Sequence, residues 1–230
     1  MIRAIIFDFN GVIADDETPH VVCFRKALAE SALSLTTQEY YGTYLGMDER
    51  TCAALLLTAR DGTCDDVQLR RIVDRKAELF RVYTEQHRPP LFSGVIEFVK
   101  AAKSHFRLAV ASGGRREQIL RALDGTAVEH DFEIIVSADD CAIGKPDPAI
   151  YLLTLQQLNA QRAQHPLLTV SECLVIEDSK AGIQAGLAAG MQVLALATTY
   201  RADQLTEAAL VLPSLEGIEP QQLARNLTAP

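Results

Sequence analysis

Short apolar runs alternate with longer stretches of mixed apolar and polar residues along most of the chain. Five runs are typical of buried parallel strands, and they cover Ile2–Phe7, Leu108–Ala111, Phe132–Val136, Cys173–Ile176 and Gln192–Ala197. The patterns between them are typical of helices, over Val95–Lys103, Glu117–Leu123, Ala149–Leu158 and Ser179–Ala189. Strands that alternate with helices form βαβ units with right-handed crossovers. The sequence therefore predicts an α/β fold, in which helices cover both faces of a parallel sheet.

One long stretch departs from this alternation. Between Asp15 and Pro89 the sequence has helical patterns but no strand pattern. The predicted helices cover Val21–Ala32, Thr37–Tyr44, Arg50–Ala59 and Val67–Gln86. Pro89 and Pro90 end this stretch, because proline cannot continue a helix. We therefore predict two domains. One is a core of residues 1–14 and 90–230, and the other is a small all-α cap of residues 15–89, inserted after the first strand.

Composition and charge narrow the choice of partners. Hydrophobic residues make up 48% of the chain and charged residues 23%, which is enough apolar surface for a substantial core. A formal net charge of −8 argues against a nucleic-acid partner, which requires a basic face. No apolar run approaches the length of a membrane span, so no membrane partner is expected. The five cysteines form no C-x-x-C pair, which favours reduced thiols and a cytoplasmic protein. We expect a monomer or a weak dimer.

Polar residues or glycines follow three of the predicted strands. They are Asp8, then Ser112 with Gly113 and Gly114, and then Glu177 with Asp178 and Ser179. In open α/β sheets, ligands bind outside the carboxyl ends of the strands. Each residue alone has a structural alternative, because Asp8 could cap a turn, and Ser112, Asp178 or Ser179 could cap a helix. Their occurrence together at one edge favours a shared site.

The residue types at this edge suit a metal ion and a phosphate. Asp8, Glu177 and Asp178 offer hard oxygen ligands of the kind that Mg²⁺ prefers. The hydroxyl of Ser112 and the amides of Gly113–Gly114 can donate hydrogen bonds to phosphoryl oxygens near a helix N-terminus.

Two further patterns concern the loops and helices around this edge. Lys145 lies in the rigid turn Gly144–Pro148, which favours a positioned cation over an isolated surface lysine. The glycines at 182, 186 and 190 share one side of a predicted helix. The helix is too short for a membrane dimer, so this spacing predicts close packing of the helix on the sheet.

Four motifs in order resemble those of the haloacid dehalogenase superfamily. They are Asp8-Phe9-Asn10-Gly11-Val12, Ser112, Lys145 in Gly-Lys-Pro-Asp-Pro, and Glu177-Asp178-Ser179-Lys180-Ala181-Gly182. The resemblance covers almost the whole chain and is to the phosphatase and phosphoglucomutase-like branch with a helical cap. It implies a Rossmann-like three-layer core, Mg²⁺ as cofactor, and phosphoryl transfer through an aspartyl-phosphate. It further implies a phosphatase that acts on a small phosphorylated metabolite similar to a sugar phosphate.

The resemblance also implies roles for individual residues. Asp8 is similar to the nucleophile, and Ser112 to the hydroxyl that binds the transferring phosphoryl group. Lys145 is similar to the lysine that neutralises charge between nucleophile and phosphate. Glu177 and Asp178 resemble the acidic pair that binds Mg²⁺ together with the nucleophile. Such charge screening is needed because a carboxylate and a phosphate repel each other.

Asn10 departs from the family pattern. Family phosphatases have a second aspartate there, which protonates the leaving oxygen and later activates water. Asn10 can still offer its backbone carbonyl to the metal, but its side chain cannot carry a proton. Losing general acid–base help costs a factor of about 10²–10⁴ in rate. Three explanations stay open: a substrate with a good leaving group, a weak phosphatase or phosphate-binding relative, or an engineered replacement that traps a complex.

The remaining candidate residues are expected to bind substrate. Gly11 and Gly113–Gly114 belong to the motifs above. The resemblance places His20 near the site, where it assists proton transfer, and an exposed histidine at a helix end is the structural alternative. Arg50 either contacts substrate from the cap or belongs to a solvated helix face.

Two other functions compete with the phosphatase. A non-catalytic sensor of phosphorylated metabolites would keep the metal and phosphate contacts, and Asn10 favours it. Cleavage of a carbon–halogen bond also uses an aspartate nucleophile, but the acidic pair at Glu177 and Asp178 suits phosphate better.

Overall fold

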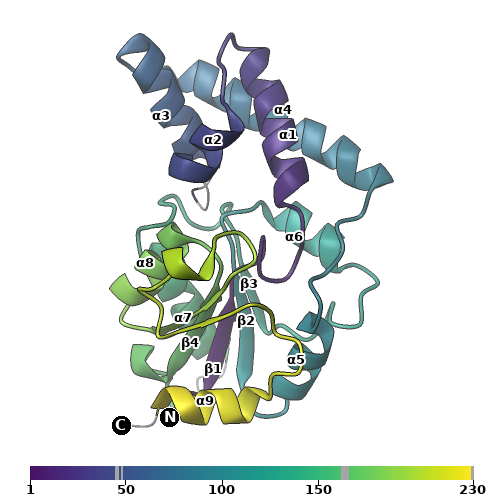
Figure 1. Ribbon diagram of the computed structural model, residues 1–230, viewed down its shortest axis with the longest axis vertical. Helices are drawn as coiled ribbons and strands as arrows, with labels where there is room; N and C mark the ends of the chain where they lie inside the picture. Colours follow the sequence, from purple (N-terminus) through teal and green to yellow (C-terminus); the bar gives the residue numbers. More distant parts are fainter. Residues whose placement is uncertain (45–46, 48, 162–165, 229–230) are drawn as a thin grey trace.

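A six-stranded parallel sheet forms the centre of the computed structural model, which describes residues 1–44, 47, 49–161 and 166–228 (Figure 1). The strands are β1 (Ala4–Phe7), β2 (Arg107–Ala111), β3 (Ile134–Val136), β4 (Cys173–Glu177), β5 (Gln192–Leu196) and β6 (Leu210–Leu212). Their order is β3-β2-β1-β4-β5-β6, and every pairing is parallel. Because β1 lies between β2 and β4, the residues that follow these three strands meet at one edge. The predicted α/β fold is confirmed.

Both faces of the sheet are buried, which explains why the strands are continuous apolar runs. In β1, Ile5 and Phe7 belong to one hydrophobic cluster, whereas Ala4 and Ile6 belong to another. This alternation follows from the two-residue period of a strand. The first cluster includes residues of α5 (Val95–Ala102), α6 (Arg116–Leu123) and α9 (Pro220–Thr228). The second includes residues of α7 (Ala149–Gln161) and α8 (Lys180–Ala188). The core therefore has three layers.

A separate group of helices stands over the carboxyl edge of the sheet (Figure 1). These helices are α1 (Glu17–Ala29), α2 (Thr37–Glu39) continued by a π-helix (Tyr40–Tyr44), α3 (Glu49–Asp61) and α4 (Asp66–Gln86). They share a hydrophobic cluster of their own, with Phe24 and Leu28 from α1, Leu57 from α3 and Ile72 from α4. The helical cap after the first strand is thus observed, while its exact limits at residues 15 and 89 stay a prediction.

The structure differs from the sequence prediction in a few elements. β6 was not predicted, because Leu210–Leu212 is too short to show a period. α9 was also missed, although Pro220 at its first position is a helix-start signal. α1 begins at Glu17 and not at Val21. Pro19 is tolerated there, because the N–H groups of a first helical turn have no intrahelical partner.

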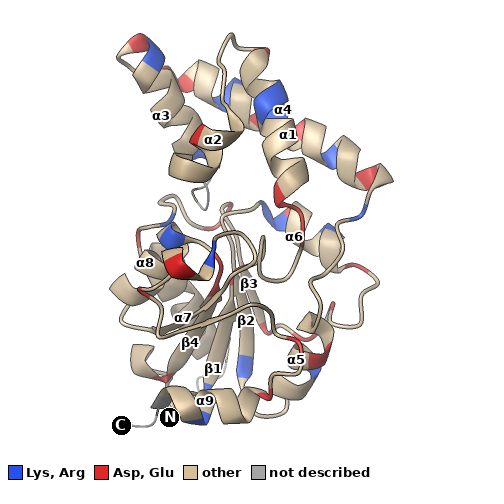
Figure 2. Ribbon diagram, viewed as in Figure 1, with Lys and Arg blue, Asp and Glu red and all other residues tan. Residues whose placement is uncertain are grey.

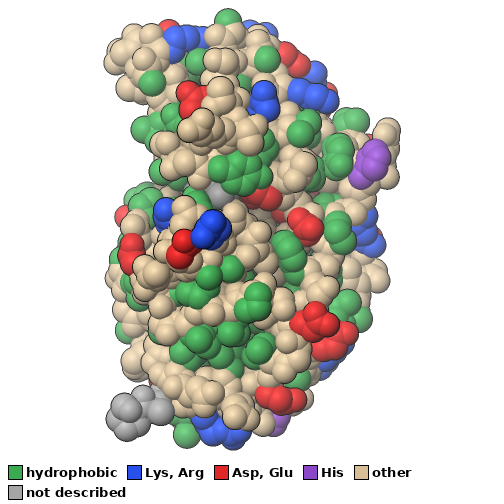
Figure 3. All heavy atoms as spheres, viewed as in Figure 1, with side chains coloured by type: hydrophobic (Ala, Val, Ile, Leu, Met, Phe, Trp, Pro, Cys, Tyr) green, Lys and Arg blue, Asp and Glu red, His purple; other side chains and the backbone are tan. Residues whose placement is uncertain are grey.

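The glycines of α8 allow this helix to pack closely on the sheet, as predicted. A Cβ added at Gly182 would lie 1.7 Å from Oε1 of Glu177, and one at Gly186 would lie 2.7 Å from Cγ2 of Val193. Among the described helices, none has the length and hydrophobicity needed to cross a membrane. Acidic and basic residues occur on both the cap and the core (Figure 2), and hydrophobic side chains are interspersed with them on the face in Figure 3.

Candidate active site

A small cavity of about 80 Å³ lies between the cap and the carboxyl edge of the sheet. Its wall includes Asp8, Asn10, Gly113, Gly114, Lys145 and Asp178 from the core, and Glu17, His20, Tyr40 and Glu49 from the cap. The core residues follow β1, β2 and β4 or precede α7. The strand order thereby brings together residues that lie up to 170 positions apart in the chain.

Lys145 lies directly against Asp8. Its Nζ donates to Oδ1 of Asp8 at 2.7 Å, to Oε1 of Glu177 at 2.6 Å and to the carbonyl of Ala111 at 3.3 Å. Burial by itself disfavours the charged lysine, but Asp8 and Glu177 outweigh it and raise the pKa of Lys145 well above its usual value. Lys145 is therefore a fixed cation beside the predicted nucleophile.

Glu177 is a fully buried anchor for this lysine. Its Oε1 also accepts from the hydroxyl of Tyr151 at 2.8 Å. Its Oε2 accepts from the backbone N–H groups of Asp178 and Ser179 at 2.9 and 3.0 Å, and from the hydroxyl of Ser179 at 2.9 Å. Burial would raise the pKa of Glu177, but Lys145 and these donors lower it. Oε1 thus holds Lys145, while the contacts of Oε2 fix the carboxylate in place.

Three carboxylates come close enough to share a cation. Ligand atoms of Asp8, Glu177 and Asp178 lie within 4.8 Å of one another. Burial raises the pKa of Asp8 to about 7, although Lys145 opposes this shift. Burial, Glu177 and Asp8 raise the pKa of Asp178 well above its usual value. Buried carboxylates that repel one another in this way fit a hard divalent cation such as Mg²⁺. Because both oxygens of Glu177 are engaged in hydrogen bonds, Asp8 and Asp178 are better placed than Glu177 to hold such a cation.

Gly11 makes room for Asp178. Its φ is +77°, and an added Cβ would lie 2.0 Å from Oδ2 of Asp178, so only glycine fits there. Its carbonyl accepts from the hydroxyl of Thr198 at 2.5 Å. The structure therefore places Gly11, a predicted substrate-binding residue, beside the predicted metal ligand.

Ser112 faces the motif that follows β1. Its hydroxyl donates to Oδ1 of Asn10 at 3.2 Å and accepts from the N–H of Gly114 at 3.0 Å. Arg115, and not Ser112, precedes the first residue of α6. The capping alternative applies instead to Ser179, whose hydroxyl accepts from the N–H of Gly182 at the start of α8.

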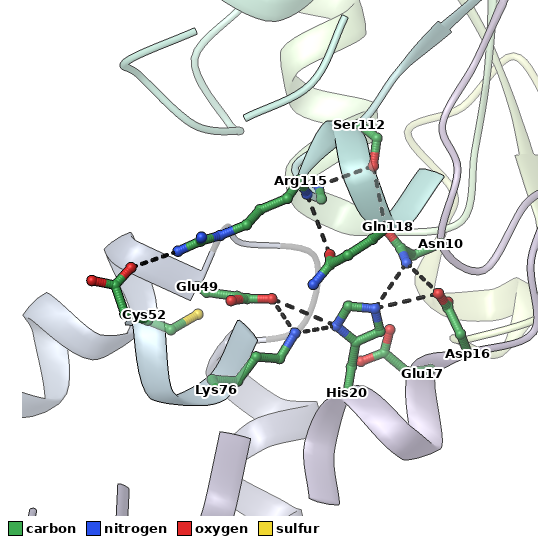
Figure 4. A network of polar contacts seen from close by, with 12 residues as sticks. Asn10, Asp16, Glu17, His20, Glu49, Cys52, Lys76, Ser112, Arg115 and Gln118 are labelled. Carbon is green, nitrogen blue, oxygen red and sulfur yellow. Dashed lines mark hydrogen bonds and ion pairs between the residues drawn. The ribbon is translucent and has the colours of Figure 1, made fainter. Parts of the chain in front are cut away.

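Asn10 is the link between this core site and the cap (Figure 4). Its Nδ2 donates to Oδ2 of Asp16 at 2.7 Å and lies 3.1 Å from Nε2 of His20. His20 is buried, so the alternative of an exposed histidine is wrong. Burial and Lys76 oppose protonation of His20, but Asp16 and Glu49 outweigh them and raise its pKa.

Lys76 and Glu49 complete the network on the cap side. Nζ of Lys76 contacts Nδ1 of His20 at 2.5 Å and pairs with Oε1 of Glu49 (Figure 4). The side chain of Lys76 is only 1% exposed. Burial would raise the pKa of Glu49, but Lys76 and His20 lower it to about 2.

Asp16, Glu49 and Lys76 were not singled out from the sequence. Lys76 does leave a signal, because it shares the buried face of α4 with Leu69, Ile72 and Phe80, and a lysine on an apolar stripe is unusual.

Arg50 lies farther out. It pairs with Asp66 at 3.5 Å, and its side chain is 56% exposed. It lines a larger cavity of about 590 Å³, as does Arg115. Glu49, Gly113 and Lys145 line both cavities. The larger cavity therefore adjoins the smaller one and offers room for the rest of a substrate.

Comparisons with known proteins agree with this arrangement. A family model described as haloacid dehalogenase-like hydrolase matches residues 2–190. The chain is 30% identical over 192 residues to the phosphorylated carbohydrates phosphatase of Thermotoga maritima, covering 83% of this chain and 82% of that protein. It is 29% identical over 234 residues to the protein CbbY of Rhodobacter capsulatus, covering 96% and 97% of the two chains.

Solved structures share the fold. β-Phosphoglucomutase from Clostridium difficile superimposes with a TM-score of 0.83 at 22% identity, covering 99% of this chain and 97% of that one. An aspartate-to-asparagine variant of CbbY from Rhodobacter sphaeroides, in complex with xylulose-1,5-bisphosphate, superimposes with a TM-score of 0.80 at 24% identity. The match covers 94% of this chain and 96% of that one. The family match, the relatives and the site together show that the chain belongs to the haloacid dehalogenase-like hydrolases and is a hydrolase of the phosphatase type.

Proposed function

We propose that the protein is a Mg²⁺-dependent phosphatase of a small sugar phosphate that works through an aspartyl-phosphate at Asp8. The observation that carries this proposal is the 2.7 Å contact of Lys145 with Asp8 in a cavity that Asp178 also lines. The phosphorylated carbohydrates phosphatase and the bisphosphate-bound CbbY structure support a phosphorylated sugar as substrate.

The reaction proceeds in two displacements. A carboxylate oxygen of Asp8 forms a bond to phosphorus, and the ester P–O bond breaks with its electron pair on the leaving oxygen, which takes up a proton. Water then attacks the phosphorus, loses a proton and releases phosphate from Asp8. Dividing the hydrolysis in this way lowers each barrier.

The surrounding residues stabilise the phosphoryl group during both steps. Lys145, held by Glu177, neutralises negative charge beside Asp8, and the hydroxyl of Ser112 binds a phosphoryl oxygen. Asp8, Asp178 and the backbone carbonyl of Asn10 would hold Mg²⁺, which supplies further charge neutralisation when bound. Because Asn10 cannot carry a proton, His20, at 3.1 Å from its Nδ2, stays the predicted proton carrier.

A phosphate-release assay on a panel of phosphorylated metabolites, with and without Mg²⁺, tests this function. Lys145→Gln keeps much of the side-chain volume but removes the charge, so release should fall by about 10²–10³-fold. Lys26→Gln, at an exposed position on the cap, is the matched control and should behave as wild type. Equal rates for Lys145→Gln and wild type would overturn the proposal.

The second candidate is a non-catalytic phosphometabolite-binding protein, and Asn10 is the observation that favours it. The CbbY variant with asparagine in place of aspartate, which holds a bisphosphate, supports this reading and equally that of an engineered trap. Because Asn10 contacts Asp16, the assay on the same panel compares wild type, Asn10→Asp and the double variant Asn10→Asp with Asp16→Asn. If none of the three hydrolyses any ester while all of them bind phosphate in the presence of Mg²⁺, the binding protein is the better description.

A further inference from the structure

The two sides of the catalytic cavity carry different charges. The core side presents Asp8 and Asp178 together with Lys145, and the proposed Mg²⁺ would further offset these carboxylates. The cap side presents the acidic side chains of Glu17 and Glu49, together with the ring of His20, which lies 3.6 Å from Glu49. Among the described residues of the wall, Lys145 is the one lysine or arginine, and it already contacts Asp8. The leaving group of a phosphate ester would thus face an acidic surface.

Glu49 lies where the two cavities adjoin. It lines both the small cavity around Asp8 and the adjoining cavity of about 590 Å³. Lys76 keeps the carboxylate of Glu49 ionised, because the pair lowers the pKa of Glu49 to about 2 although burial opposes this. Lys76 itself is buried in the cap and 1% exposed, so a ligand in the cavity meets Glu49 and not the lysine.

Glu17 adds a second acidic side chain on the same side, although burial raises the pKa of its carboxyl group. It lies at the first position of α1, and one of its oxygens accepts from the hydroxyl of Tyr40. Two arginines line the larger cavity, the exposed Arg50 and the half-buried Arg115, and they pair with Asp66 and Asp74. Both arginines therefore lie beyond Glu49. His20, the basic residue of the cap in the small cavity, is already paired with Asp16 and Glu49, at 3.3 and 3.6 Å.

We propose that Glu49, assisted by Glu17, is a specificity-determining residue that selects phosphate monoesters with hydroxyl or ammonium groups close to the ester and rejects those with an acid there. The inference rests on the proposed phosphatase function. A carboxylate accepts hydrogen bonds from hydroxyls and attracts an ammonium group, whereas a second anion in the same confined space is repelled.

Three esters of equal chain length test the inference: phosphoethanolamine, ethylene glycol monophosphate and phosphoglycolate. Their dissociation constants are measured by calorimetry with Mg²⁺ present, and phosphate release is measured separately. We expect binding to weaken in that order, with phosphoethanolamine at least about tenfold tighter than phosphoglycolate, equivalent to roughly 1.4 kcal/mol. If phosphoglycolate binds as tightly as the other two esters, the inference is overturned. Absence of phosphate release with the binding order intact counts against the proposed function alone.

Three variants test whether Glu49 and Glu17 cause the difference in binding between the esters. Glu49→Gln should reduce the ratio between phosphoethanolamine and phosphoglycolate by about tenfold, because it also leaves the charge of Lys76 unopposed. Glu17→Gln, which keeps an acceptor for Tyr40, should reduce the ratio as well and serves as a second variant if the first does not fold. Glu78→Gln, at an exposed ion pair with Arg75 on α4, should leave the ratio unchanged. An unchanged ratio in both cavity variants would overturn the role of these carboxylates.

Discussion

Asn10 and Asp16 form a direct contact, in which Nδ2 of Asn10 donates to Oδ2 of Asp16 at 2.7 Å. Asp16 is only 3% exposed. An ionised aspartate at position 10 would have no proton to donate and would face Asp16 with a like charge. The asparagine that departs from the family pattern is therefore matched to the charge of its neighbour.

This contact predicts how substitutions at the two positions combine. Asn10→Asp alone should gain little phosphate release, because the two carboxylates must share a proton or separate. The double variant Asn10→Asp with Asp16→Asn removes that repulsion and should gain far more, up to about 10²–10⁴-fold over wild type. Turnover of one ester by wild type, both single variants and the double variant measures the coupling. If phosphate release rises equally in Asn10→Asp and in the double variant, Asp16 does not limit the activity that an aspartate at position 10 provides.

Binding of Mg²⁺ should stabilise the folded protein, because it relieves repulsion between Asp8 and Asp178. Adding Mg²⁺ at 100 times its dissociation constant contributes about 2.7 kcal/mol, so the thermal midpoint should rise, and EDTA should reverse the rise. Asp178→Asn should raise the midpoint of the metal-free protein and abolish the response to Mg²⁺. Asp203→Asn, at an exposed surface pair, should keep the response. No shift with Mg²⁺ in wild type would contradict the proposed metal site.

Gly182→Ala should disturb Lys145 indirectly, through Glu177. An added Cβ would lie 1.7 Å from Oε1 of Glu177, and that carboxylate is fixed by its hydrogen bonds. We expect a loss of about 1–3 kcal/mol in the free energy of unfolding, together with slower phosphate release because Lys145 loses its anchor. Gly42→Ala is the matched control, since nothing lies within 4 Å of a Cβ there. Urea denaturation and the phosphate assay report the two effects. If Gly182→Ala has the stability and the phosphate release of wild type, α8 can shift without disturbing Glu177 and Lys145.

The buried pair of Glu49 and Lys76 predicts a pH dependence of stability. The pKa of Glu49 falls from 4.5 to about 2 in the folded protein. A depressed carboxyl pKa contributes stability that is present above the unfolded value and is lost as pH falls toward the folded value. As the pH falls from 4.5 to about 2, the free energy of unfolding should therefore decrease more for wild type than for Glu49→Gln. Urea denaturation across this range measures the difference, and Glu78→Gln should follow wild type. Parallel curves for wild type and Glu49→Gln would mean that Glu49 is not stabilised by Lys76.

Much of the core could be predicted from the sequence because its signals are local. The apolar run before Asp8, the helical patterns after each strand and the helical stretch up to Pro89 each lie within one short segment. The edge position of Asp8, Ser112 and Asp178 follows from the rule that ligands bind at the carboxyl ends of parallel strands. Leu210–Leu212 escaped prediction because three residues carry no measurable period.

The sequence by itself determined the α/β class, the helical insertion and the residues at the carboxyl ends of the strands, because hydrophobic periodicity encodes which face of each element is buried. Only the tertiary structure decided that Glu177 anchors Lys145 and that Asn10 faces Asp16. It also decided that Lys76 meets His20, although 56 positions separate them in the chain. Such contacts depend on how the cap sits on the core and on the direction of individual side chains, and no local pattern specifies either.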